Sequence, residues 1–183
     1  MNNPESQMVA VTVRAGSKAE MALPDGTFVH LNAATNLEYD VNNSKQRLVK
    51  LSGEAFFDVA KNPDCPFKVI INDLQIEVVG TSFNVKTYKK DIVETSLLSG
   101  RIRISGGSLP HEYTLSPGQK ATYSAMDRTL RISKADAHVE AGWRDNYLIF
   151  ESTPLIDVIA QIERWYGAVS YTHLRAHETT LHL

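Results

Sequence analysis

The chain has 183 residues, enough for one sizeable domain or for one domain and part of a second. Hydrophobic residues make up 43% of it and charged residues 22%, a balance typical of globular proteins and unlike that of disordered chains. Its 19 basic and 21 acidic residues give a formal net charge of -2, which argues against a nucleic-acid-binding surface, since such surfaces are basic.

The sequence carries no recognisable targeting or membrane-spanning signal. Its first eight residues are polar, and no apolar run approaches the ~20 residues that span a bilayer. A single cysteine, Cys65, excludes an intrachain disulfide but is compatible with an oxidising compartment. If the protein works outside the cytoplasm, we expect the segment that carried it across the membrane to lie upstream.

Short strands are predicted up to about residue 133, because apolar and polar residues alternate there with a period of two. The alternation is clearest at 74–78 (LQIEV), and a β-branched run lies at 67–71 (FKVII). Turn-forming residues separate the strands, as at Pro24-Asp25-Gly26. Roughly a dozen strands at this spacing predict a mainly β fold, either an antiparallel sandwich or a twisted solenoid.

The pattern changes after Trp143. Residues 146–150 (NYLIF) predict one more strand, and Thr153 and Pro154 are typical of the N-cap and first position of a helix that Gly167 would end. Apolar residues recur on one face of that helix, at Leu155, Val158, Ile159, Ile162, Trp165 and Tyr166. A strand and an amphipathic helix cannot bury their apolar faces by themselves, so we expect an incomplete α/β unit. The stripe is interpreted as a core face that missing strands would leave partly exposed.

The segment Val169–Thr179 (VSYTHLRAHET) breaks with this pattern. On a helix, His173 and His177 would share one face, a spacing that suits a zinc pair. However, the segment matches one reading frame of a common transposase-based sequencing adapter. We therefore expect residues 169–183 to be a non-native tail and Ala168 to be the last native residue.

Six motifs occur in order between residues 23 and 119. They are Leu23-Pro24-Asp25-Gly26-Thr27 with Leu31-Asn32; Gly53-Glu54-Ala55-Phe56-Phe57-Asp58-Val59-Ala60-Lys61; Pro66-Phe67; Gly80-Thr81-Ser82-Phe83-Asn84-Val85; Leu98-x-Gly100; and Pro117-Gly118-Gln119. Together they resemble the signature of FecR-type regulators. The segment from Trp143 to Gly167 resembles the start of the small secretin/TonB N-terminal-like (STN-like) domain that follows in Bacteroidetes members.

The resemblance implies a non-enzymatic anti-sigma factor anchored in the inner membrane, with this chain as its periplasmic part. It implies a flexible remnant at 1–8, a FecR-type domain at 9–135, a linker at 136–145 and a truncated STN-like domain at 146–168. The implied partner is the signalling domain of a TonB-dependent outer-membrane transporter. The sigma factor would be reached only through a cytoplasmic segment absent from this chain, and no cofactor, nucleic acid or small-molecule substrate is implied.

The motif residues are interpreted as structural, and no catalytic, cofactor or metal site is assigned to them. Asp25 and Asn32 suit side-chain-to-backbone hydrogen bonds. Glu54 and Asp58 are expected on a solvated strand face ~13 Å apart, too far for a carboxylate pair acting on one bond. His30 is expected to be exposed. The candidate docking residues are Tyr147, Leu148 and Phe150, because an exposed strand edge offers unpaired backbone groups to a partner.

One alternative stays open at this point, a carbohydrate- or cell-wall-binding β-module. Four tyrosines could supply rings for stacking on sugars: Tyr39, Tyr88, Tyr113 and Tyr123. They fall on separate predicted strands, and the sequence shows no aromatic cluster.

Overall fold

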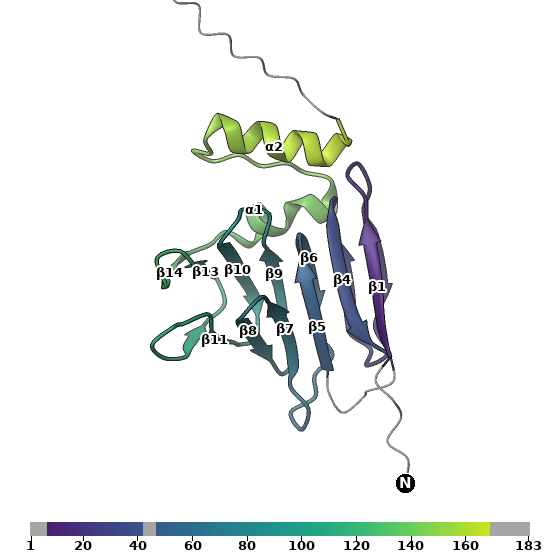
Figure 1. Ribbon diagram of the computed structural model, residues 1–183, viewed down its shortest axis with the longest axis vertical. Coiled ribbons are helices and arrows are strands. Elements are labelled where there is room, and N and C mark those ends of the chain that lie inside the picture. Colours follow the sequence, from purple (N-terminus) through teal and green to yellow (C-terminus); the bar gives the residue numbers. More distant parts are fainter. Residues whose placement is uncertain (1–6, 42–46, 169–183) are drawn as a thin grey trace, which may run out of the picture.

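The computed structural model describes residues 7–41 and 47–168 of the chain, and these form two seven-stranded sheets followed by a helical segment (Figure 1). The first sheet has the order β1-β4-β5-β7-β8-β11-β12. Its strands are β1 Met8–Val13, β4 Thr35–Asp40, β5 Arg47–Ser52, β7 Phe67–Ile71, β8 Leu74–Val78, β11 Ile102–Gly106 and β12 Tyr113–Leu115. The second sheet has the order β14-β13-β10-β9-β6-β3-β2. Its strands are β2 Ala19–Ala22, β3 Phe28–Leu31, β6 Glu54–Asp58, β9 Ser82–Lys86, β10 Ile92–Ser99, β13 Gln119–Ser124 and β14 Thr129–Lys134.

The mainly β prediction is confirmed, and the architecture is a sandwich. The chain crosses between the sheets after every one or two strands, so both sheets are built from the whole length of the domain. All strand pairs but one are antiparallel; the exception is β5 with β7, which run parallel with Val49 opposite Val69. After β5 the chain crosses to the second sheet to form β6, and it then returns to the first sheet as β7. Because β7 runs in the same direction as β5, the two strands pair in parallel.

The core lies between the sheets and is filled from both. Phe57 of β6 stacks on Phe83 of β9 in the second sheet, with ring centroids 5.2 Å apart. Phe57 also meets Phe67 of β7 in the first sheet at 5.8 Å, which joins the two layers. The predicted alternation at 74–78 is the observed burial pattern, and the β-branched run at 67–71 alternates in the same way, since every second residue of both strands faces this core. Burial of such aromatic side chains supplies much of the stability of a sandwich.

The segment after β14 differs from its prediction. Residues 146–150 form no strand; Asn146 adopts a left-handed conformation, and the Tyr147 amide donates to the Gly142 carbonyl instead of to a neighbouring strand. The expected linker is folded into the short helix α1, Ala137–Ala141, and the 3-10 turn η1, Gly142–Asp145. The predicted division into two domains stays a prediction.

Helix α2, Leu155–Tyr166, ends as predicted at Gly167, which is left-handed with a φ of 65°. Its start differs, because the Thr153 hydroxyl donates to the Glu151 carbonyl and Pro154 occupies the N-cap. Figure 1 shows α2 lying across one end of the sandwich. Among residues 7–41 and 47–168, no helix is long and apolar enough to cross a membrane. The predicted tail, with His173 and His177, lies outside the described residues.

Gly53 occupies a position in the fold where a side chain does not fit. Its φ is 113°, and a Cβ built on it would lie 2.7 Å from the Thr35 Cα. Gly118 has a φ of 78°, but a Cβ there would meet nothing within 4 Å. We expect Gly53→Ala to lower the free energy of unfolding by more than about 2 kcal/mol, whereas Gly118→Ala costs about 1 kcal/mol from its backbone conformation only. Urea denaturation of both variants checks this, and equal losses would contradict the steric explanation.

Candidate functional site

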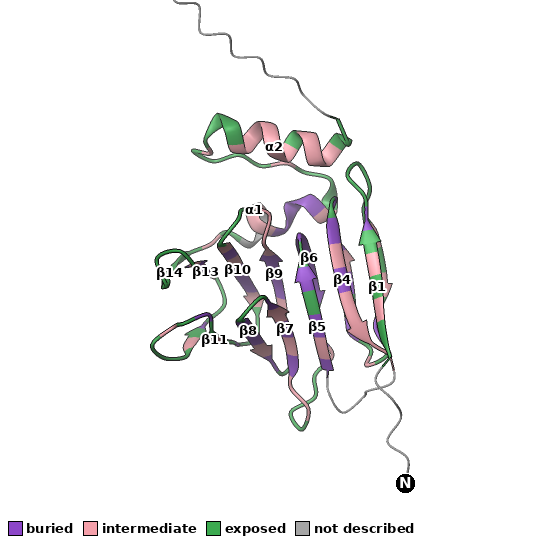
Figure 2. Ribbon diagram, viewed as in Figure 1, coloured by how far each residue is buried: buried purple, intermediate pink, exposed green. Residues whose placement is uncertain are grey.

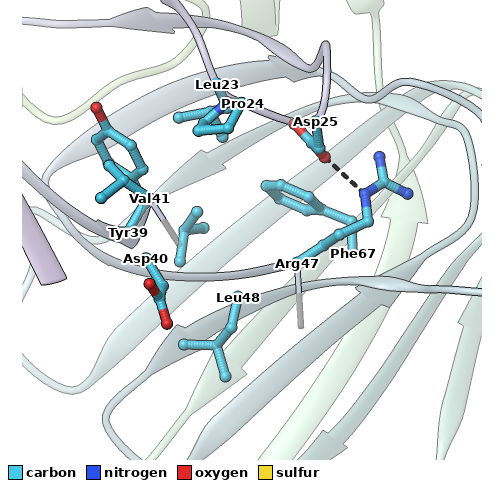
Figure 3. Close-up of a pocket in the computed structure, with 10 residues that line it drawn as sticks. Leu23, Pro24, Asp25, Tyr39, Asp40, Val41, Arg47, Leu48 and Phe67 are labelled. Atoms are coloured by element: carbon cyan, nitrogen blue, oxygen red, sulfur yellow. Dashed lines mark hydrogen bonds and ion pairs between the residues drawn. The ribbon is translucent and has the colours of Figure 1, made fainter. Parts of the chain in front are cut away.

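Three of the sequence motifs converge on one buried side chain, Arg47 at the start of β5 (Figure 3). Its Nε donates to Asp25 Oδ2 at 2.6 Å. Its two terminal nitrogens donate to the carbonyl oxygens of Cys65 at 3.0 Å and Ala60 at 2.6 Å. Asp25 in turn accepts hydrogen bonds from the Thr27 amide and hydroxyl. One guanidinium therefore fastens the hairpin at 23–27, the end of β6 and the chain entering β7.

Arg47 was missing from the sequence interpretation, although the sequence carries a signal for it. With a period of two, Arg47 falls on the same strand face as Val49 and Leu51, and both of these are buried. A charged residue at an apolar position requires a buried partner. A small recess beside the ion pair is lined by Leu23, Tyr39 and Phe67, among others (Figure 3). Val41 and Arg47 also line it.

A second polar network joins two motifs to the helical segment through Glu54. The Asn32 amide donates to Glu54 Oε2 at 2.8 Å, and the Asn84 amide donates to Glu54 Oε1 at 2.9 Å. The indole Nε1 of Trp143 donates to Asn84 Oδ1 at 3.1 Å. The expectation of a solvated Glu54 is wrong: only 5% of the residue is exposed. Sequence periodicity placed it correctly on the outer face of its strand, but it could not show that the helical segment covers that face.

Burial raises the pKa of Glu54, and this outweighs the lowering effects of Lys86 and the two amide donors. Between the ordinary value of 4.5 and the raised pKa, the folded protein holds a proton that the unfolded chain has released. The contribution of Glu54 to stability therefore falls as the pH rises through that window, and it levels off above it. As the pH rises from about 4 to about 7, the free energy of unfolding of the wild type should therefore fall relative to that of Glu54→Gln. Urea titrations across this range check it; a difference that does not vary with pH would contradict it.

A small satellite core lies on the outer face of the second sheet. Phe56, Ala141 and Trp143 are buried there together, and the guanidinium of Arg144 lies over the Phe56 ring at 3.6 Å. His30 is half-buried rather than exposed, because its ring meets Phe56 at 6.0 Å. The helical segment is thus packed against the sandwich by its 3-10 turn.

Lys18, in the turn between β1 and β2, makes the second attachment of this segment. Its ammonium donates to the Trp143 carbonyl at 2.6 Å and to Asn146 Oδ1 at 2.9 Å, and it lies 3.5 Å from the centre of the Trp165 ring. Burial lowers the pKa of Lys18, against the raising effect of Glu54. Near it, the Gly16 amide donates to the Arg164 carbonyl at 2.8 Å. Polar contacts therefore hold α2 to the sandwich.

Most of the apolar face of α2 lies outside these contacts, with Trp165 as the exception. No residue of α2 is buried, and Figure 2 shows the helix as half-buried and exposed along its length. The stripe interpreted as a core face is thus exposed at Leu155, Ile162 and Tyr166 and half-buried at Val158, Ile159 and Trp165. Twelve large hydrophobic residues are exposed among the described residues, and seven of them lie between 147 and 166. They are Tyr147, Ile149, Phe150, Leu155, Ile156, Ile162 and Tyr166. We call residues 147–166 the apolar segment.

The residues predicted for docking lie in the apolar segment. Tyr147 is 66% exposed and Phe150 37%, whereas Leu148 is half-buried. The motif residues lie elsewhere, at strand ends and in the core. The buried ones include Leu23, Leu31, Phe57, Val59, Thr81 and Phe83. Those in turns or bends include Pro24, Gly26, Gly80, Pro117 and Gly118. Pro66 is half-buried, and the Ser82 hydroxyl donates to the Asp58 carboxylate.

The four tyrosines considered for sugar stacking do not form one platform. Tyr123 is buried in the core, and its hydroxyl donates to the Gly107 carbonyl. Tyr88 donates to the Ala33 carbonyl and lies under the Arg164 guanidinium, 4.1 Å from it. Tyr39 and Tyr113 lie on β4 and β12, which other strands of the first sheet separate. These four tyrosines therefore offer no shared surface for stacking on a sugar.

The part of the chain that holds most of these motif residues matches a known protein family. Residues 9–103, which contain both polar networks apart from Trp143, match the family model described as FecR protein. The chain belongs to the FecR family. The FecR signature is thus a structural one, because its polar residues fasten strand ends and its phenylalanines fill the core.

Two solved structures resemble this FecR chain over more than the family match. Both are candidate anti-sigma factors from Parabacteroides distasonis. One is 31% identical, with a TM-score of 0.81, and the match covers 88% of this chain and 76% of that one. The other is 32% identical, with a TM-score of 0.80, and the match covers 87% and 75%. No curated protein matches the sequence.

Proposed function

We propose that this chain is the periplasmic, signal-transducing portion of a membrane-anchored anti-sigma factor that acts by protein recognition rather than catalysis. Its partner is the signalling domain of a TonB-dependent outer-membrane transporter, whose state it relays to an extracytoplasmic-function sigma factor. A cytoplasmic segment outside this sequence binds the sigma factor. Membership of the FecR family and similarity to two candidate anti-sigma factors support this proposal.

The observation that carries the proposal is the concentration of exposed apolar side chains in the apolar segment. Surfaces of monomeric proteins rarely expose a contiguous apolar patch unless it binds something. Here Leu155, Ile162 and Tyr166 recur at helical spacing along α2, and Tyr147 and Phe150 precede them on the same segment. Large side chains of this kind anchor protein interfaces.

The attachment of the segment suits a signalling role. Trp143 holds it to the sandwich through one hydrogen bond to Asn84, and Lys18 holds it through two hydrogen bonds and one ring contact. A partner that binds the apolar segment would therefore act on a unit that is connected directly to the Glu54 network. This connection supports a route from the proposed docking surface to the FecR motifs.

Titration calorimetry with the purified transporter signalling domain tests the proposal, beside a glycan panel. We expect micromolar binding that Tyr147→Ala with Phe150→Ala abolishes. Met126→Ala is the matched control, because Met126 is 80% exposed and lies in the turn between β13 and β14. Micromolar binding to glycans, with no binding to the signalling domain, would overturn the proposal.

A further inference from the structure

The edge formed by β1 differs from the other three edges of the sandwich. The edge strands are β1 and β12 in the first sheet and β2 and β14 in the second. β12 has three residues, and β2 has four, with a glutamate among them. β14 carries Arg131 and Lys134. Short length and charge are the usual means by which proteins prevent an edge strand from pairing with another chain.

β1 has neither protection. Met8–Val13 reads MVAVTV, six residues with no charge, proline or glycine. Valine and threonine favour extended strands. Figure 1 shows β1 at the rim of its sheet, and β4 is its single neighbour among the described strands. Its outer edge is therefore a template for a further strand.

The register shows which backbone groups face outward. β1 is antiparallel to β4, with Val9 opposite Tyr39, and the Val41 amide donates to the Gln7 carbonyl. Hydrogen-bonded pairs alternate along such a ladder. Every second residue from Gln7, which includes Val9 and Val11, therefore bonds to β4. Met8, Ala10 and Thr12 direct their N–H and C=O groups away from it.

We propose that β1 pairs antiparallel with β1 of a second copy of this chain, with Ala10 opposite Ala10 across a two-fold axis. In that register the outward groups of Met8, Ala10 and Thr12 in both copies form about six hydrogen bonds. The interface is isologous, so an uncharged strand meets itself without like-charge repulsion. The buried face of β1 continues from one copy to the next, which extends both cores into one layer.

The dimer is weak and depends on concentration. One strand edge buries less than the ~1,200 Å² that stable complexes need. The inference does not rest on the proposed function, because the β1 edge and the apolar segment are different surfaces. Either can fail while the other holds.

Sedimentation velocity over a concentration series tests the pairing, with Ala10→Pro as the decisive variant. Proline at this position removes an outward N–H and leaves the bonds to β4 in place, a position where edge strands accept proline. We expect it to raise the dimer dissociation constant by about tenfold or more, since each copy loses a hydrogen bond at the centre of the interface. Ala10→Lys keeps the backbone groups and sets two ammonium groups opposite each other, so we expect it to weaken the dimer as well.

Ile132→Pro is the matched control on β14. Since the Ala135 amide donates to the Gly118 carbonyl, the same alternation turns the Ile132 amide outward. This variant should leave the dissociation constant unchanged. The pairing is refuted if the wild type stays monomeric at its highest soluble concentration. It is also refuted if Leu155→Glu with Tyr166→Lys abolishes association while both Ala10 variants retain it. Circular dichroism verifies that each variant is folded. If Ala10→Pro is unfolded, the dissociation constant of Ala10→Lys is the test of the pairing.

Discussion

Replacing Arg47 with methionine should lower the free energy of unfolding by about 3–5 kcal/mol, the range for breaking one side of a buried ion pair. The loss is large because Arg47 serves four acceptors, and the side chain is only 2% exposed. Its removal leaves the Asp25 carboxylate and the carbonyls of Ala60 and Cys65 short of a donor. Urea denaturation measures the change.

Lys50→Met is the matched control for this prediction, since Lys50 lies on the same strand. Its side chain is 58% exposed and its ammonium lies 3.9 Å from Glu38, so the substitution should cost no more than about 0.5 kcal/mol. Arg47→Lys keeps the charge but cannot reach all of these acceptors from one ammonium, and should fall between the two. Equal stability of Arg47→Met and Lys50→Met would show that the cluster is not what holds the three motifs together.

Replacing Trp143 with alanine should release the helical segment from the sandwich. The substitution removes the largest side chain of the satellite core and the donor to Asn84, and comparable tryptophan truncations cost about 3–5 kcal/mol. The main core contains no part of the segment, so the sandwich should stay folded. Hydrogen exchange should then show protection lost from 137 to 166 and retained in β6 and β9.

Trp165→Ala is the control for that experiment. Trp165 is half-buried and meets the Lys18 ammonium through its ring face, a contact worth about 0.5–2 kcal/mol. We expect it to loosen α2 with little effect on α1 or η1. If Trp143→Ala leaves exchange in the segment unchanged, the Glu54 network is not its attachment.

The sandwich was predictable because its signals are local. Alternation at 74–78 corresponds directly to burial, the β-branched run at 67–71 forms a strand, and the motif glycines and prolines mark turns. Asp25 illustrates the limit: its bond to the Thr27 amide was expected from its turn position, but its partner Arg47 lies on a strand 22 residues away. The sequence does not state which buried positions meet across the fold.

The helical segment was harder to predict, for a physical reason. Residues 146–150 have strand-forming composition, but they pair with none of the described strands, and the Tyr147 amide bonds to the Gly142 carbonyl. The amphipathic pattern of α2 correctly predicts a helix, yet it does not determine which face meets the sandwich. The contacts of Trp165 with Lys18, of Arg164 with Tyr88 and of Asp157 with Lys89 determine that face. They leave Leu155, Ile162 and Tyr166 exposed.

The central claim is that the apolar segment is the surface that recognises the transporter signalling domain. Hydrogen exchange of the chain with and without that domain tests it most directly. We predict binding with new protection confined to residues 147–166, and unchanged exchange at the opposite end of the sandwich around Arg47. Absence of binding, or protection that falls on the Arg47 end and spares 147–166, would contradict the claim.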